Sequence, residues 1–241
     1  MAPRRKLVTD SNSGQTSQQG DSSVDQIVHH IRQGIISGQY RENTKLLPKL
    51  IAERCETSFI PVREALRILE SEGFVVFRHN RGAWITPLSI DDLEDLYDLR
   101  MDLEGEAVRR ARPLKQRDIE RLYDIVDRIN IANSRSDSHK VVSLNRDLHF
   151  LVYRRSDSPR RLKMIEQLWL HADRYQHKSL EFRHDAAEGE HREVIRHLEA
   201  GDHNAAAEAM QDHLSSTVSL LRSGFAQVDP ATDSEMHVSD D

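Results

Sequence analysis

Three histidines in the second half of the sequence lie on the apolar faces of separate predicted helices, namely His149, His191 and His213. On each face, aliphatic side chains recur at intervals of three or four residues. A single histidine on such a face is usually a hydrogen-bonded core residue. Three converging imidazoles, however, suit Zn²⁺, Ni²⁺ or a related divalent ion. We therefore interpret the three histidines as candidate metal ligands.

The spacing of the last two histidines supports their convergence. A break at Gly201-Asp202 joins the two predicted helices that carry them. At 1.5 Å per residue, His191 lies about 15 Å and His213 about 18 Å from this turn. An antiparallel pair of helices therefore brings both imidazoles to nearly the same height. On the helix of His149, Asn145 lies one turn earlier and points to the same side.

Arg100 is a charged residue on an apolar face that also carries Leu93, Leu96 and Tyr97. A guanidinium in such a place is expected to be paired or to bind an anion. Two interpretations stay open at this point. One is an ion pair with Glu104, four residues later. The other is a binding site for a small carboxylate beside a metal that has open coordination positions.

The first half of the sequence predicts three helices followed by a β-hairpin. Helical periodicity covers 24–37, a second short helix runs from about Pro48 to Cys55, and a third covers 61–73. A three-residue connection between the second and third helices is typical of a helix-turn-helix. Two β-rich runs around the turn 79–82 then complete a winged helix-turn-helix.

In a helix-turn-helix, residues at the start of the second helix contact base edges in the major groove of DNA. These residues are Ser58, Phe59, Ile60 and Arg63. The hairpin adds Arg78, His79 and Arg81, which suit phosphate or minor-groove contacts. The alternative is a winged helix that contacts protein, with Arg63 in a surface ion pair with Glu64 or Glu70.

The segment LLPKLIAERCETSFIPVREALRILESEGFVVFRHNRGAWITPLS resembles the DNA-binding domain of GntR-family bacterial transcriptional regulators. PVREALRIL, the EG that ends the helix and NRG before the last strand carry the resemblance. The resemblance implies that Lys49 joins the DNA contacts, at a position where the family has Arg. Phe59 stands where the family has an arginine at the entry to the recognition helix, so a guanine contact is replaced by an apolar surface for a thymine methyl.

The segment from about 90 to 222 resembles the all-helical FCD domain of the FadR-like subgroup of that family. LYDLRMDLEGEAV, LNRDLHFLVYRRSDSPRRLKMIEQLW, EGEHREVIRHLEAGD and AMQDHL carry this resemblance. It implies a metal site formed by Asn145, His149, His191 and His213, and an organic-acid effector. The family has Asp where this chain has Asn145, and the loss of an anionic oxygen is expected to weaken metal binding.

Composition limits the remaining possibilities. The 241 residues contain one cysteine, which excludes an internal disulfide, and no apolar run of the roughly 20 residues that a membrane span needs. Residues 1–88 contain 12 Lys and Arg against 9 Asp and Glu, whereas 89–241 contain 22 against 31. A mildly basic first half and an acidic second half confine any phosphate contact to the first half. We expect a cytoplasmic protein with no membrane contact.

We therefore expect a mainly α fold with four segments. These are a disordered tail over 1–23, a winged helix-turn-helix over 24–88, an all-α bundle of about six helices over 89–224 that binds effector and metal and dimerises, and an acidic disordered tail over 225–241.

The expected function is that of a homodimeric transcriptional regulator that binds a pseudo-palindromic double-stranded DNA operator, associates with the nucleoid when bound, and represses until a small organic acid binds. We expect no enzyme activity. One alternative is a metal-dependent hydrolase built on the three histidines. It lacks a clear general base, because Asp147 is expected to point away from the cluster. A second alternative is a dedicated metal sensor.

Overall fold

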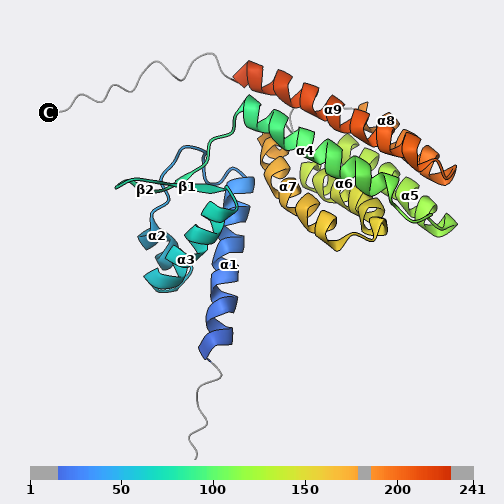
Figure 1. Ribbon diagram of the computed structural model, residues 1–241. Coiled ribbons are helices and arrows are strands. Elements are labelled where there is room, and N and C mark those ends of the chain that lie inside the picture. The colour runs from blue at the N-terminus through green and yellow to red at the C-terminus, as the bar shows by residue number, and fades with distance from the viewer. Residues whose placement is uncertain (1–15, 179–185, 229–241) are drawn as a thin grey trace, which may run out of the picture. The chain divides into compact units, whose positions relative to one another are not determined.

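The computed structural model describes residues 16–178 and 186–228, and it divides the chain into two compact units (Figure 1). The first unit is Met1–Pro87 and the second is Leu88–Asp241. As the sequence predicted, the fold is mainly α with one small antiparallel sheet. None of the described helices is long and apolar enough to cross a membrane.

The first unit is a winged helix-turn-helix. Its elements are α1 (Thr16–Ile36), α2 (Pro48–Arg54), α3 (Phe59–Ser71), β1 (Val75–Arg78) and β2 (Gly82–Ile85). The two strands pair antiparallel, with Val75 opposite Ile85 and Arg78 opposite Gly82. The apolar positions that predicted the helices are the buried ones, and Ile31, Val62, Leu66 and Leu69 have at most 1% of their surface exposed. Gly73 follows α3 with a φ of 80°, a left-handed conformation that favours glycine and ends the helix.

The starts of two helices in this unit differ from the prediction. α3 begins at Phe59, because Pro61 falls within the first turn, where the amide that proline lacks has no partner inside the helix. α1 begins at Thr16, within the predicted tail over 1–23. Extending an existing helix needs no new nucleus, and Gln18 and Gln19 are good helix formers. Residues 1–15 of that tail lie outside the described residues.

The second unit is a bundle of helices joined by short connections. Its described elements are α4 (Ile90–Arg109), α5 (Gln116–Ser134), α6 (Ser138–Tyr153), the 3₁₀ turn η1 (Arg154–Ser156), α7 (Pro159–Lys178), α8 (Ala186–Glu199) and α9 (His203–Val228). α4 packs along α9 and against α7, α8 pairs with α9, and α5 packs on α6 and α8. α9 extends past residue 224 to Val228, so its last turn occupies the start of the predicted acidic tail, whereas 229–241 lie outside the described residues.

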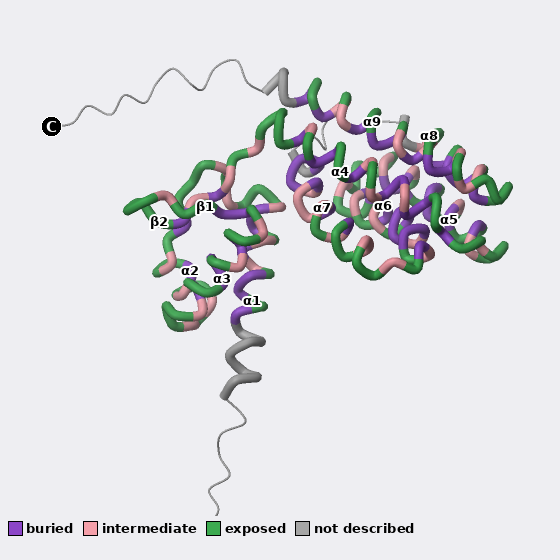
Figure 2. Tube along the Cα trace, in the orientation of Figure 1, coloured by how far each residue is buried: buried purple, intermediate pink, exposed green. Residues whose placement is uncertain are grey.

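The second unit buries its apolar side chains between its helices (Figure 2). One cluster contains Leu122, Val126, Leu144, Ile165 and Trp169, and a second contains Leu93, Tyr97, Tyr175 and Leu221. α8 begins at Ala186 and includes Gly189 in its first turn. Glycine in the first turns of a helix costs only about 1 kcal/mol relative to alanine, and packing of the α8 apolar face overrides that cost.

Candidate metal centre and nucleic-acid interface

The second unit brings His149 of α6, His191 of α8 and His213 of α9 into one buried cluster. One ring nitrogen from each residue lies within 4.8 Å of the other two. Each histidine has at most 2% of its surface exposed. Three helices from different parts of the chain therefore present neutral nitrogen donors to one small volume, which is the arrangement that a divalent ion requires.

The ring nitrogens are oriented for metal binding. His149 Nε2 lies 3.3 Å from His191 Nε2, which matches the separation of about 3.3 Å between two ligands of a tetrahedral ion with bonds of about 2.0–2.1 Å. His149 Nδ1 lies 2.7 Å from the Tyr153 hydroxyl. His213 Nδ1 lies 2.7 Å from Glu190 Oε2. Contacts of the other ring nitrogen with a carboxylate or hydroxyl fix ring orientation at metal sites.

A buried hydrogen-bond network fixes the orientation of His149. The Tyr153 hydroxyl donates its single proton to the Glu104 carboxylate. Burial and the Glu104 charge raise the pKa of Tyr153 well above its ordinary value, so this proton stays on the phenol. The hydroxyl oxygen then accepts from His149 Nδ1. The network thus holds the His149 ring with Nε2 toward His191.

Arg100 pairs with Glu104, which is one of the two interpretations that the sequence left open. Its Nε donates to Glu104 Oε1 at 2.7 Å, and Trp169 Nε1 donates to the same oxygen at 3.0 Å. The guanidinium lies 4.5 Å from the Tyr97 ring centroid and 4.7 Å from that of Trp169. Burial opposes the charged form of Arg100, but Glu104 and the neighbouring tyrosines outweigh it and raise the Arg100 pKa. Arg100 Nη1 is buried and has no hydrogen-bond partner among the described residues.

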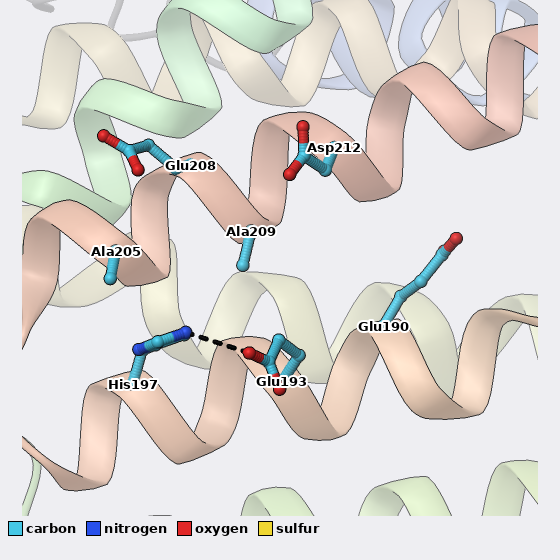
Figure 3. A pocket seen from close by; sticks show the side chains of 7 residues that line it. All are labelled: Glu190, Glu193, His197, Ala205, Glu208, Ala209 and Asp212. Atoms are coloured by element: carbon cyan, nitrogen blue, oxygen red, sulfur yellow. Dashed lines mark hydrogen bonds and ion pairs between the residues drawn. The ribbon is translucent and has the colours of Figure 1, made fainter.

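An acidic groove of about 340 Å³ lies between α8 and α9 (Figure 3). It is lined by Glu190, Glu193, His197, Ala205, Glu208, Ala209 and Asp212. Glu190 is part of its wall and also contacts the buried His213. The sequence reasoning missed Glu190 and Tyr153. The four-residue spacing of Tyr153 from His149 was an available signal, whereas the contact of Glu190 depends on how α8 packs on α9.

Asn145, the remaining candidate ligand, is also buried, with 4% of its surface exposed, and lies one turn before His149 in α6. Its side chain therefore belongs to the same interior as the three imidazoles.

In the first unit, the candidate DNA contacts are exposed. Phe59 and Ile60 expose 49% and 76% of their surfaces, and Lys49, Ser58, Arg63, His79 and Arg81 are also exposed. Arg78 is half-buried, because it donates to Asn43 at 2.9 Å and lies 4.5 Å from the Trp84 ring centroid. Arg78 therefore fixes the end of β1 next to the turn against Asn43, whereas His79 and Arg81 lie in the turn itself.

Arg63 has no ion pair with Glu64 or Glu70 among the described residues, so the surface pair considered from the sequence is not formed. Arg63 instead lines a groove of about 480 Å³ together with Arg67, Glu70 and Phe77. Arg67 lies one turn after Arg63 on the same exposed face of α3. The sequence reasoning did not select Arg67, although the four-residue spacing was visible.

A winged helix-turn-helix followed by a helical bundle with a buried polar site defines a class of two-domain DNA-binding regulators. Residues 23–85 match the model of bacterial regulatory proteins of the gntR family, and residues 95–216 match the FCD domain model. The chain therefore belongs to the GntR family, in the subgroup with an FCD domain, whose members are transcriptional regulators.

Several regulators are similar to this chain over much of its length. The HTH-type transcriptional regulator McbR of Escherichia coli K12 is 27% identical over 146 residues, which cover 60% of this chain and 66% of McbR. BphR of Paraburkholderia xenovorans LB400, an uncharacterized HTH-type transcriptional regulator, is 26% identical over 210 residues, covering 83% and 86% of the two chains. A solved structure of a putative GntR regulator from Rhodococcus sp. RHA1 superposes with a TM-score of 0.71 at 22% identity, covers 84% of this chain and 98% of its own, and shows the shared fold.

The buried Arg100–Glu104 pair predicts a large effect of removing one partner. Replacement of Glu104 by Gln leaves the Arg100 charge buried without compensation, so we expect the free energy of unfolding to fall by about 3–5 kcal/mol in urea denaturation. Glu106→Gln is the matched control on the same helix, because Glu106 pairs with the exposed Arg109 and Arg110. We expect Arg100→Met with Glu104→Leu to recover most of the loss, since no unpaired charge remains. Equal stabilities of the Glu104 and Glu106 variants would contradict this account.

Proposed function

We propose that this protein is a ligand-responsive transcriptional regulator whose first unit binds double-stranded operator DNA and whose second unit senses a small carboxylate at a metal centre. The observation that carries the sensing part is the buried cluster of three imidazoles with oriented nitrogens. Membership of the GntR family supports the DNA-binding part.

His149, His191 and His213 are the residues that hold the metal, with Asn145 as a further oxygen donor. Three histidine nitrogens favour Zn²⁺ or Ni²⁺ over Mg²⁺ or Ca²⁺, which prefer oxygen ligands. The bound ion supplies open coordination positions for an anionic oxygen. Asn145 offers a neutral oxygen in place of a carboxylate, so the site keeps more positive charge for an anionic effector.

Arg100 binds the effector carboxylate through Nη1, which is its one nitrogen without a partner. The Tyr97 and Trp169 rings flank the guanidinium, and the Trp169 ring centroid lies 5.1 Å from that of His149. The arginine and the candidate metal ligands therefore share Trp169 as a neighbour, which supports one small molecule as their common ligand.

DNA binding uses α3 and the hairpin. Ser58, Phe59, Ile60 and Arg63 contact base edges, while Lys49, Arg67, Arg78, His79 and Arg81 contact phosphates or the minor groove. A second copy of the chain forms a homodimer that binds two half-sites about 34–36 Å apart. Effector binding changes the spacing of the two recognition helices and releases the operator, which makes the protein a repressor.

A regulator is favoured over a hydrolase because the nearby carboxylates are already engaged. Glu190 contacts His213, and Glu104 accepts hydrogen bonds from Arg100, Tyr153 and Trp169. A general base must be free to take a proton from water, and neither group meets this requirement.

Replacement of Arg63 by Ala tests the DNA interface. The probe is the duplex that the purified protein selects from a random-sequence pool. We expect the variant to bind it more weakly by at least about 1 kcal/mol at fixed salt, because a bidentate base contact is lost. The control is Arg121→Ala, which removes an exposed arginine of α5 in the second unit. Equal affinities of the two variants would contradict the docking, and failure to select any duplex would contradict DNA binding itself.

Replacement of both His191 and His213 by Ala tests the metal centre. Elemental analysis is expected to find about one divalent ion per wild-type chain and none in the double variant, since one remaining imidazole cannot form the site. The control is His197→Ala, which changes a histidine of the neighbouring acidic groove that is bonded to Glu193. An undiminished metal content in the double variant would refute the assignment.

Native mass spectrometry tests the effector. We expect the mass of the folded chain to include one divalent ion together with a small organic acid, and the acid to be lost in an Arg100→Lys variant, which keeps a cation beside Glu104 and keeps the ion. Operator affinity is then measured with and without this acid. If operator affinity changes with zinc alone and no acid copurifies, the protein is a dedicated metal sensor and the carboxylate assignment is wrong.

A further inference from the structure

α7 is joined to α4 at two separate places in the second unit. Near the end of α4, Trp169 of α7 donates to Glu104, the carboxylate that also anchors Tyr153 and hence the ligand His149. At the start of α4, Tyr175 of α7 contacts Ser89 and Asp92. One helix therefore links the network around the metal centre to the first turn of α4.

The contacts of Tyr175 surround the N-cap of α4. The phenol donates to the Asp92 carboxylate, accepts from the Ser89 amide at 3.3 Å, and lies 3.2 Å from the Ser89 carbonyl oxygen. Ser89 in turn accepts from the Asp92 amide through its hydroxyl and from the Leu93 amide through its carbonyl. Burial and the Asp92 charge raise the pKa of Tyr175, so the phenol remains protonated. Tyr175 thus holds both ends of the capping turn.

The space between these two places is filled by packed side chains. Tyr175 has 1% of its surface exposed and belongs to the cluster that contains Leu93, Leu96 and Tyr97. Gln176, the next residue of α7, donates to the Tyr97 hydroxyl at 3.5 Å, and the Tyr97 ring flanks Arg100. Because close-packed interiors transmit displacement rather than absorb it, a shift of α7 at Trp169 must move the first turn of α4.

The first turn of α4 is where the second unit continues into the first along the chain. Pro87 is the last residue of the first unit, and Ser89 caps the continuous helix that begins at Ile90. We propose that Tyr175 is a positioning residue that couples the occupancy of the three-histidine centre to this turn, and thereby to the DNA-binding unit. This inference rests on the proposed function, because it assumes that the centre binds a ligand.

Tyr175→Phe removes the phenol oxygen and keeps the buried ring, so the variant should fold. The probe is Zn²⁺, titrated into the metal-free full-length protein. In the wild type we expect zinc to slow hydrogen exchange of the Asp92 and Leu93 amides by about tenfold, within the range typical of coupled sites. In the variant we expect unchanged zinc stoichiometry and unchanged protection around Glu104, but no effect of zinc on the two capping amides. The ratio of operator affinities with and without zinc should likewise fall to about one.

Tyr123→Phe is the matched control, because it removes a phenol of α5 that donates to Glu199, away from the junction. This control should keep the full response of the capping amides. Two results would overturn the coupling: a wild-type protein that binds zinc without any change at Asp92 and Leu93, or a Tyr175 variant that keeps the wild-type change. A wild-type protein that binds no zinc overturns the proposed metal centre, and the coupling with it, which distinguishes the two failures.

Discussion

The carboxylate of Glu104 is the group on which the rest of the second unit depends. It is fully buried, and a buried charge is tolerated only when its oxygens are paired. Its partners come from three helices, because Arg100 lies on α4, Tyr153 on α6 and Trp169 on α7. Pairing the oxygens of one carboxylate therefore fixes the relative positions of three helices. Tyr153 in turn orients His149 through a hydrogen bond. The three-histidine cluster is thus preorganised by a group that does not belong to it.

The sequence alone predicted the architecture and the histidines, because both depend on periodicity. Apolar residues at helical spacing show which side of a helix is buried, and the turn at Gly201-Asp202 sets the heights of His191 and His213. The partners of those histidines could not be predicted in the same way. Whether Glu190 contacts His213 depends on how α8 packs on α9, and whether Arg100 pairs with Glu104 or awaits an anion depends on rotamers. The periodicity of apolar residues predicts which face of a helix is buried, but it does not predict the hydrogen-bond partners of the polar side chains on that face.

In the first unit, the sequence predicted the recognition helix but not its first residue. A helix that starts with proline and a helix that has proline later in its first turn show the same apolar periodicity, so periodicity alone does not distinguish them. The exposed surfaces of Phe59 and Ile60 have a physical meaning of their own. Large apolar side chains at the start of α3 leave area in water that folding does not bury. Contact with a partner that presents methyl groups removes this cost, and the major groove of T-containing DNA is such a surface.

Within the second unit, α4 carries both Glu104 and the capping turn at Ser89. A helix that is hydrogen-bonded along its length moves as a rigid rod. A displacement of one end therefore displaces the other end as well. α7 adds a second connection between the same two places through Trp169 and Tyr175. Two helices joined at two separate places cannot slide independently, so a change at the three-histidine cluster must either leave both in place or move both together.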